Sequence, residues 1–341
     1  MAKALRLGVI GCGGFVHFHL RTLFEKMKTK WKVVGLVDVA ADNARRVIDT
    51  YELTKEPAIY SDHKKMLRDI KPDAVIVSSP HTLHYQHCSD ALGAGAHVLV
   101  EKPMVTNADH ARKLVRKARR KGLNLQIAIQ GTYTDTFAYS RQLIDDGTVG
   151  ELQLVSGIMA QGWMQGTKGK WRQDPELSGG GQLYDSTAHV LSAIMFLVNS
   201  PVKEVFCYAD NKGTDVDINA VGCIRFANGC LGTITSGGNC PTWKSHVTLQ
   251  GANARLEISA HGGDFEVSGR SFKEPITGVP KRGWKVKSTT PIQNFYDVIM
   301  GTDEPRCPGR LGIMLADLMD GLYASADTGQ PAKITKRLPK Q

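Results

Sequence analysis

The chain has 341 residues, of which 42% are hydrophobic, and its 43 basic and 33 acidic residues give a formal net charge of +10. This length predicts about two domains, and the apolar content is that of a globular protein with a sizeable core. No apolar run approaches the ~18 residues of a membrane-spanning helix, and the first expected strand begins too early to leave room for a signal peptide. We therefore expect a cytoplasmic protein without a membrane partner.

The positive charge does not by itself indicate nucleic-acid binding. In the densest basic stretch, RKLVRKARRKG (112–122), Leu114, Val115 and Ala118 keep helical spacing, so the basic residues are expected to form the solvated face of one helix. No recognition module accompanies this charge, and an anionic cofactor or substrate is a simpler use for it. We expect no nucleic-acid partner.

Cysteine and histidine spacings give little support for a metal. The seven cysteines are scattered without a C-x-x-C pair, which predicts neither a zinc site nor a disulfide framework and suits a reducing compartment. His81, His84 and His87 recur every three residues with Cys88 adjacent, but no carboxylate completes a ligand set. No metal is expected.

Strands and helices are predicted to alternate through the first third of the chain. The expected strands are uniformly apolar, which requires cover on both faces, as in a parallel sheet with crossover helices. The strands are expected at 4–10, 32–38, 73–79, 97–101 and 124–129, with helical segments near 15–28, 41–53, 62–70, 82–94 and 107–121. Residues 1–129 are therefore predicted to form a doubly wound α/β domain of the Rossmann type.

The pattern changes from residue 130. After a helix (136–146), a strand (151–161) and a helix (181–198), short alternating runs indicate antiparallel strands. The Asn-Gly pair in RFANGCLGTI predicts a hairpin, and the closing helix (311–329) ends at a glycine followed by a proline. Residues 130–341 are predicted to form an α+β domain, with a mainly antiparallel sheet and helices on one side.

The stretch CGGFVHF (12–18) lies where a dinucleotide-binding loop would complete its glycine pattern. Gly11 permits the tight turn, Gly13 lets the backbone approach a pyrophosphate at the helix N-terminus, and Gly14 adds another position without a Cβ. Val16 replaces the small residue that usually allows close helix–strand packing, so this helix is expected slightly further from the sheet. A glycine turn without a ligand would explain the loop alone, but its βαβ context favours a dinucleotide site.

Asp38 ends the second expected strand, near the spacing of ~20 residues at which an acidic residue holds the ribose hydroxyls. Its carboxylate would accept a hydrogen bond from the 2′-hydroxyl and repel a 2′-phosphate. Val39 and Ala40 provide no cation to bind that phosphate. The predicted cofactor is therefore NAD rather than NADP.

Two further motifs carry side chains that can act on a substrate. HVLVEKPM (97–104) places Glu101, Lys102 and Pro103 at the carboxyl end of a parallel strand, where doubly wound folds bind ligands. SGGGQLYDSTAHVL (178–191) opens a helix expected to present Asp185 and His189 on one face. Each motif also has an ordinary explanation, namely a surface lysine and an exposed polar pair.

Together these motifs resemble the glucose–fructose oxidoreductase/inositol dehydrogenase/rhizopine catabolism (Gfo/Idh/MocA) family. The resemblance covers nearly the whole chain and includes SSPHTLHYQHCSDALGAGAHVLVEKPM (78–104), LIDDGTVGEL (143–152) and GLYASADTGQP (321–331). It implies a nicotinamide-binding Rossmann domain, an open-faced, mainly antiparallel sheet domain for substrate binding and oligomerisation, and an active site between them. It also implies a homodimer or homotetramer.

By this resemblance, Lys102, Asp185 and His189 match the family's catalytic trio. Contacts with NAD are expected from the glycine loop and from the ends of the following strands: Gly11, Gly13, Gly14, Phe15, Asp38, Ser79, Pro80, His84, Glu101 and Lys102. The chain departs from the family pattern at four positions, namely Val16, Thr132 in place of a common arginine, Thr187 in place of a frequent glycine and Ser192 in place of a frequent aspartate. These departures leave the substrate open.

The trio suits the oxidation of an alcohol. His189, with an ordinary pKa near ~6.5, suits a general base, while Lys102 can donate to the same oxygen and stabilise the developing alkoxide. Asp185 can bind a neighbouring hydroxyl or orient the imidazole. Because the resemblance implies a polyol, we predict an NAD-dependent oxidoreductase acting on a secondary hydroxyl of a sugar, glycoside or cyclitol.

The loop QGWMQGTKGKWRQDPELSGGG (161–181) is expected to shape the substrate pocket together with the region of Thr132. Trp163 and Trp171 could stack on a sugar, and Arg172, with two nearby lysines, could meet an acidic group. These side chains could equally pack on the surface or at a subunit contact. A neutral or weakly acidic sugar is expected, with a neutral one favoured.

Two other functions stay open at this point. Some relatives use NAD transiently, oxidising a sugar carbon so that a glycosidic bond breaks by elimination, and then reduce the carbon again. A protein that only senses NAD or a sugar is the alternative of another class, and the intact trio argues against it.

Overall fold

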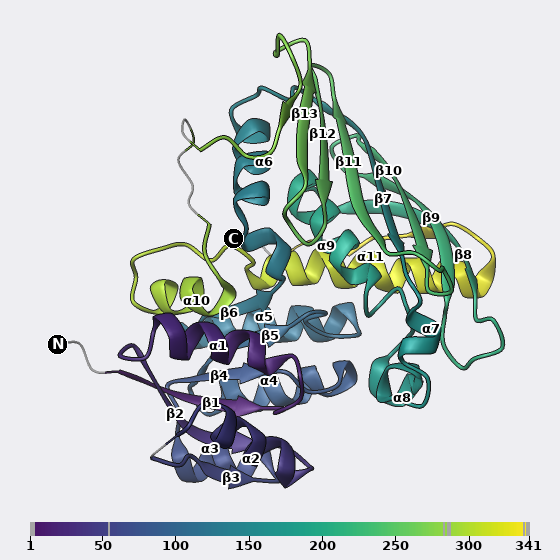
Figure 1. Ribbon diagram of the computed structural model, residues 1–341. Coiled ribbons are helices and arrows are strands. Elements are labelled where there is room, and N and C mark those ends of the chain that lie inside the picture. Colours follow the sequence, from purple (N-terminus) through teal and green to yellow (C-terminus); the bar gives the residue numbers. More distant parts are fainter. Residues whose placement is uncertain (1–3, 54, 282–283, 285–287, 337, 339–341) are drawn as a thin grey trace. The chain divides into compact units, whose positions relative to one another are not determined.

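The computed structural model describes residues 4–53, 55–281, 284, 288–336 and 338, and the chain forms two compact units (Figure 1). The first unit comprises Met1–Val105, Asp109–Ala128 and Thr290–Gly309. The second comprises Thr106–Ala108, Ile129–Thr289 and Arg310–Gln341. Each unit is built around one sheet.

The first unit has the predicted doubly wound fold. Its six strands are all parallel, in the order β3-β2-β1-β4-β5-β6. They are β1 (Leu5–Ile10), β2 (Trp31–Val37), β3 (Ala58–Tyr60), β4 (Ala74–Val77), β5 (His97–Glu101) and β6 (Leu125–Ala128). β4 and β6 are buried at every residue, which is the reason that their sequences are apolar without alternation.

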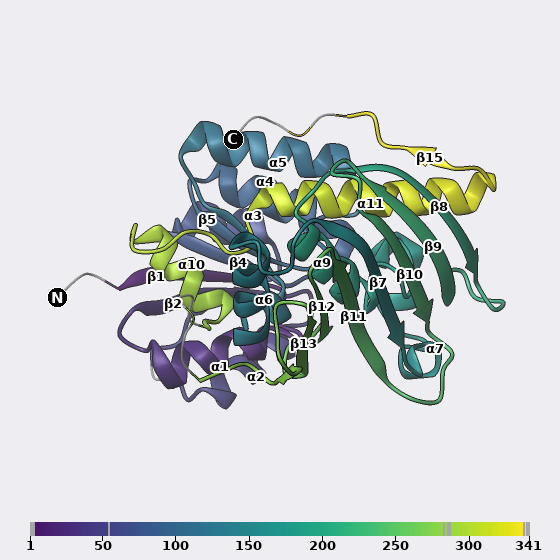
Figure 2. The same ribbon diagram turned by 90° about the horizontal axis from the view of Figure 1, so that it is seen from above.

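Helices cover both faces of this sheet. They are α1 (Val16–Lys26), α2 (Ala41–Thr50), α3 (His63–Ile70), the short 3₁₀ helix η1 (His81–Leu83), α4 (His84–Gly93), α5 (Ala108–Lys121) and α10 (Pro291–Ile299). Figure 2 shows α4 and α5 on one side of the strands and α1 and α2 on the other. Because the strands are all parallel, the turns from strand to helix lie at the carboxyl ends of the strands, where folds of this kind bind ligands.

Residues 290–309 correct the expectation of one boundary between 129 and 130. Helix α10 packs against α1, β5 and β6 in the first unit. The buried rings of Phe295 and Trp31 stack with their centroids 6.0 Å apart, and Gln126 Nε2 donates a hydrogen bond to Asn294 Oδ1 at 2.6 Å. The chain returns because α10 covers apolar side chains that the earlier elements leave open.

The second unit contains a nine-stranded sheet, in the order β14-β13-β12-β11-β7-β10-β9-β8-β15. Neighbouring strands are antiparallel except for β7 and β10, which are parallel. The strands are β7 (Leu152–Ala160), β8 (Val202–Asp210), β9 (Asn219–Phe226), β10 (Leu231–Gly237), β11 (Lys244–Gly251), β12 (Ala254–Ser259), β13 (Phe265–Gly269), β14 (Ile276–Thr277) and β15 (Ala332–Lys333). The predicted Asn-Gly hairpin is confirmed between β9 and β10, where Gly229 has a φ of +94°.

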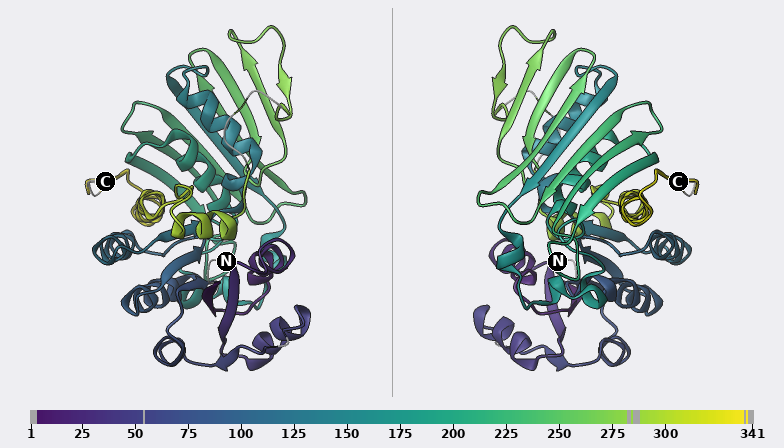
Figure 3. Two further views of the ribbon diagram at one scale, coloured as in Figure 1. Left: turned by 90° about the vertical axis from the view of Figure 1, so that its left-hand side faces the viewer. Right: turned by 90° about the vertical axis from the view of Figure 1, so that its right-hand side faces the viewer.

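Helices lie along one face of this sheet and leave the opposite face open in the part of the chain that the structure describes (Figure 3). The helical segments are η2 (Gln130–Tyr133), α6 (Asp135–Asp145), α7 (Trp163–Gly166), η3 (Trp171–Gln173), α8 (Pro175–Ser178), α9 (Thr187–Val198) and α11 (Gly309–Thr328). Helix α9 is buried almost throughout and packs on β7 and β11. Along the described residues, no helix combines the length and apolar character needed to cross a bilayer.

Candidate functional site

The glycine loop between β1 and α1 is shaped by a close backbone approach. Gly11 has a φ of +89°, and a Cβ on it would lie 2.5 Å from the carbonyl carbon of Ser78, which directly follows β4. A Cβ on Gly13 or Gly14 would meet no described atom within 4 Å, so this part of the backbone is open to a ligand. Phe15, next in the loop, is 44% exposed.

Val16 is accommodated without loss of packing. Its side chain is fully buried in the same hydrophobic cluster as Leu7, Val9 and Leu20. The departure from a small residue therefore lies in the core between α1 and the sheet, away from the open face of the glycine loop.

Asp38 links the end of β2 to the glycine loop. Its Oδ2 accepts a hydrogen bond from Cys12 N at 2.8 Å, and its Oδ1 accepts from Ala40 N at 2.9 Å and from Asn43 Nδ2 at 3.1 Å. Burial, aided by the Asp38 charge, raises the pKa of the Cys12 thiol to about 12, so this thiol stays protonated. A carboxylate offers about four acceptor positions, so Asp38 can bind a further hydroxyl beside the loop that it supports.

His84 joins the loops that follow β4 and β5. Its Nε2 lies 2.8 Å from Ser79 O and its Nδ1 lies 2.8 Å from Pro103 O, within a fully buried ring. Pro80 lies between these contacts, immediately before η1. Burial lowers the pKa of His84, although both carbonyl oxygens oppose this change. Both ring nitrogens of His84 are thus directed at backbone carbonyl oxygens. Among the described residues, no cluster of three or more potential metal ligands is found.

Glu101 ends β5 and contacts a histidine of α1. Its Oε1 lies 2.7 Å from Nε2 of the fully buried His19, and Lys102 N donates to its Oε2 at 3.3 Å. The peptide bond between Lys102 and Pro103 is cis. His19 was not among the predicted site residues, and its only sequence signal is a polar side chain on the buried face of the helix that follows the glycine loop.

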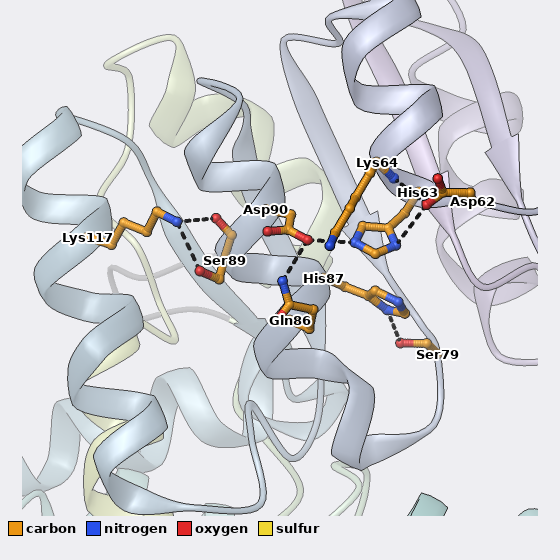
Figure 4. Close-up of polar contacts among 9 residues, drawn as sticks. All are labelled: Asp62, His63, Lys64, Ser79, Gln86, His87, Ser89, Asp90 and Lys117. Carbon is orange, nitrogen blue, oxygen red and sulfur yellow. Dashed lines mark hydrogen bonds and ion pairs between the residues drawn. The ribbon is translucent and has the colours of Figure 1, made fainter.

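A second group of polar side chains supports the loop after β4 (Figure 4). His87 Nδ1 lies 2.8 Å from Ser79 Oγ. The His87 ring packs edge-on against His63, with centroids 4.4 Å apart, and His63 Nε2 lies 2.8 Å from Asp90 Oδ2. Burial, helped by neighbouring His63 and His84, lowers the pKa of His87 to about 4. His87 is therefore neutral at physiological pH and holds the Ser79 hydroxyl.

In the second unit, Asp185 and His189 lie around the start of α9, and this helix begins later than expected. The predicted helix over 181–198 begins only at Thr187, so Asp185 lies in the preceding turn and His189 in the first helical turn. The expectation that both project from one helical face was therefore wrong. The glycines of SGGG disfavour helix, and Asp217 binds the backbone of this segment instead.

Asp217 is the buried anchor of that turn. It is 4% exposed and accepts hydrogen bonds from Gly181 N at 2.7 Å, from Leu183 N at 2.9 Å and from the Tyr323 hydroxyl. A Cβ on Gly181 would lie 1.9 Å from Asp217 O, and one on Gly180 would lie 2.3 Å from the Tyr323 oxygen. Two of the three glycines are therefore required by close approach. Neither Asp217 nor Tyr323 was predicted, because nothing in their local sequence indicates a contact so distant along the chain.

The Asp185 carboxylate is held by two donors from the 161–181 loop. Trp163 Nε1 donates to Asp185 Oδ2 at 2.7 Å, and Arg172 Nε donates to the same oxygen at 2.9 Å. Trp163 is buried, so its ring packs inside the unit. The Arg172 guanidinium lies over the Trp171 ring, 4.6 Å from its centroid. The structure thus brings Trp163, Trp171 and Arg172 together at Asp185, where Arg172 is paired with a carboxylate.

The other three residues that depart from the family pattern are buried in the second unit. Thr132 is fully buried in η2 and its Oγ1 donates to Ile129 O at 2.7 Å. Thr187 Oγ1 lies 2.6 Å from Ser236 Oγ, and Ser192 is fully buried. On the His189 side of the unit the structure places a ring that the sequence did not indicate, since the His261 and His189 centroids are 4.4 Å apart.

A doubly wound sheet with a glycine turn after β1 and a carboxylate at the end of β2 defines a dinucleotide-binding protein. Residues 5–129 match the family model described as "Oxidoreductase family, NAD-binding Rossmann fold", and residues 137–265 match the GFO/IDH/MocA C-terminal domain. The chain belongs to the Gfo/Idh/MocA family, which confirms the resemblance seen in its motifs.

Similar proteins include several sugar and cyclitol oxidoreductases. D-glucoside 3-dehydrogenase of Escherichia coli (strain K12) is 28% identical over 217 residues, a match covering 62% of this chain and 59% of that protein. 1,5-anhydro-D-fructose reductase of Ensifer adhaerens is 24% identical, with 80% of this chain and 82% of that protein covered.

Solved structures share the fold across nearly the whole chain. Levoglucosan dehydrogenase in complex with NADH has a TM-score of 0.84 at 18% identity, covering 98% of this chain and all (100%) of that one. The WlbA dehydrogenase from Bordetella pertussis, in complex with NADH and UDP-GlcNAcA, has a TM-score of 0.83 at 20% identity, with 99% of each chain covered. The present chain is an NAD-binding oxidoreductase of the type to which sugar and cyclitol dehydrogenases belong.

Proposed function

We propose that this protein transfers hydride between a secondary hydroxyl of a sugar, glycoside or cyclitol and NAD. One observation carries the proposal most directly: a buried carboxylate, Asp185, is fixed by two donors in the turn before the helix that carries His189. A fixed hydrogen-bond acceptor in the turn that leads to a histidine of the first helical turn is suited to holding one hydroxyl of a polyol while another is deprotonated.

The residues of the first unit fit NAD. Gly11 lets the loop pass the end of β4, Gly13 and Gly14 leave open space, and Asp38 adds a carboxylate next to that loop. We propose that these residues hold NAD together with further contacts at the strand ends from Phe15, Ser79, Pro80, His84, Glu101 and Lys102. Bound NAD would supply the hydride acceptor.

In this proposal His189 acts as the general base and accepts the hydroxyl proton. Lys102 donates a hydrogen bond to the same substrate oxygen, which stabilises negative charge as the proton leaves. Asp185 accepts a hydrogen bond from a neighbouring hydroxyl and thereby orients the ring. In the reverse direction His189 returns the proton to the oxygen of the ketone, so the same residues serve reduction.

The pairing of Arg172 supports a neutral sugar rather than an acidic one. Its guanidinium is already matched by the Asp185 carboxylate at 2.9 Å. Lys170 Nζ, from the same loop, donates to Gly166 O at 2.7 Å and is exposed. An acidic group is bound best by charge-assisted hydrogen bonds from cations, whereas the hydroxyls of a neutral sugar need only the acceptors and donors proposed above.

The test is NADH formation over a panel of hexoses, glycosides, inositols and uronic acids. We expect turnover of at least one neutral member, with kcat lowered by about 10²–10⁴ in His189→Ala and in Lys102→Ala. His246→Ala is the matched control, since this histidine of β11 contacts Glu257 rather than Asp185. Unchanged kcat in both site variants would overturn the roles of His189 and Lys102.

The same panel separates the alternative functions. Aglycone release with catalytic NAD and without net NADH would indicate the elimination route of a glycosidase. Binding of NAD and a sugar without any turnover would indicate a sensor. Stoichiometric NADH formation is the result expected for the dehydrogenase.

We also propose a homodimer or homotetramer that uses the open face of the second unit's sheet. Leu154, Tyr208, Val221 and Leu231 are each at least 44% exposed on strands of this sheet, and apolar side chains gathered on one sheet face favour cover by another subunit. A cytoplasmic location is part of the proposal, supported by seven cysteines that are all free thiols. A monomeric mass at micromolar concentration would contradict the proposed assembly.

A further inference from the structure

Three aromatic rings form a row in the second unit, and we call Trp243, His261 and His189 the aromatic row. The centroids of His189 and His261 are 4.4 Å apart, and those of His261 and Trp243 are 5.5 Å apart. His261 contacts the proposed base His189 on one side and Trp243 on the other, so its imidazole lies between the base and the indole.

The strand pattern explains why these rings meet. Trp243 precedes β11, where Ser245, Val247 and Leu249 are buried on the face that α9 covers. Trp243 lies two residues before Ser245, whose Oγ contacts His261, and the ring of Trp243 contacts the same histidine. The strand β12 pairs antiparallel with β11, His246 lying opposite Ser259, and therefore delivers His261 beside the start of β11.

Other contacts hold His261 in place. Its Nδ1 lies 2.9 Å from Ser245 Oγ. The turn that carries it passes so close to η2 that a Cβ on Gly131 would lie 2.2 Å from Ala260 O. The middle ring of the row is thus held by a side chain of β11, and the backbone that carries it is held close to η2.

The row runs from one buried ring to two exposed ones. His189 is 8% exposed, whereas His261 is exposed and Trp243 is 59% exposed. Tryptophan is usually well buried, and its large rigid ring makes it a frequent anchor for ligands. The exposed indole of Trp243 contacts His261, which in turn contacts the proposed base His189, and is therefore available to a substrate.

We propose that Trp243, supported by His261, forms a subsite for the second group of a glycoside, meaning an aglycone or a second sugar ring. A sugar ring that reacts at His189 would lie against His261, and the group attached to it would reach the indole and stack on its face. This inference rests on the proposed function, and it deepens it by favouring glycosides over free monosaccharides.

The experiment compares a free monosaccharide oxidised in the panel with its own phenyl glycoside. In Trp243→Ala we expect KM for the phenyl glycoside to rise about tenfold, the loss expected for one aromatic contact with its buried area. In the same variant, kcat for both substrates and KM for the free sugar should stay within twofold of the wild-type values. Trp243→Phe should restore most of the glycoside affinity, because it keeps a stacking face.

Lys244→Ala is the matched control, since this exposed neighbour alternates to the opposite face of β11. Equal loss for the free sugar and the glycoside in Trp243→Ala, or no loss for either, would overturn the subsite. Isothermal calorimetry with the phenyl glycoside and NADH gives a second measurement that does not need turnover. A wild-type protein that neither binds nor oxidises any panel member would overturn the proposed function itself. If the wild type oxidises a panel member and Trp243→Ala has the wild-type KM for the phenyl glycoside, only the subsite is overturned.

Discussion

Replacing Asp217 by alanine tests whether one buried carboxylate holds the turn that leads to Asp185 and His189. Asp217 accepts hydrogen bonds from the backbone amides of Gly181 and Leu183 and from the Tyr323 hydroxyl, and it is almost fully buried. Alanine would remove every acceptor on this side chain. The two amides would stay buried because glycines at 180 and 181 pack directly against neighbouring atoms.

The expected loss follows from the number of orphaned donors. A buried donor left without a partner costs about 1–3 kcal/mol, so the two amides alone, without the Tyr323 hydroxyl, predict a decrease of about 2–6 kcal/mol in the free energy of unfolding. This is a large part of the ~5–15 kcal/mol that stabilises a typical domain. Tyr323→Phe leaves both amides bonded and should cost only about 0.5–1.5 kcal/mol.

Urea unfolding measures the loss, and hydrogen exchange of the peptide 178–191 locates it. We expect faster exchange of this peptide in Asp217→Ala and a lower kcat, since Asp185 and His189 follow the released turn. Asp215→Ala is the control, because Asp215 is exposed two residues away and should change stability by no more than about 0.5 kcal/mol. The reasoning is refuted if Asp217→Ala unfolds like wild type and exchanges at the wild-type rate.

Two further predictions concern the first unit. Asp38→Ala should weaken NAD binding about 10- to 100-fold, because it removes a charged acceptor worth ~1.5–3 kcal/mol, and it should weaken NADP binding less. The measurement is the Kd of each cofactor for the wild type and the variant. A wild type that binds NADP more tightly than NAD would contradict the role of Asp38. His87, whose pKa burial lowers from 6.5 to about 4, binds more protons in the unfolded state between these pH values. Its contribution to stability is therefore complete above pH 6.5 and is lost as the pH falls toward 4, by roughly 3 kcal/mol, and His87→Gln should flatten this part of the stability–pH curve measured by urea unfolding.

Local sequence patterns determined most of the fold. The uninterrupted apolar strands and the glycine loop predicted the doubly wound sheet, and the Asn-Gly pair predicted the β9–β10 hairpin, because each depends on neighbouring residues only. The family resemblance likewise rests on short motifs whose order is visible along the chain. Lys102, Asp185 and His189 are therefore recognisable as candidate site residues from the sequence alone.

Tertiary structure alone decided what surrounds those motifs. Asp217 reaches Gly181, His261 reaches His189, and residues 290–309 return to the first unit. These contacts join segments far apart in the chain, and no periodicity or spacing encodes which distant side chain will fill a given position. The turn at Asp185 was predicted as helix for the same reason, since the acceptor that holds its amides comes from residue 217, which lies beyond the reach of local pattern.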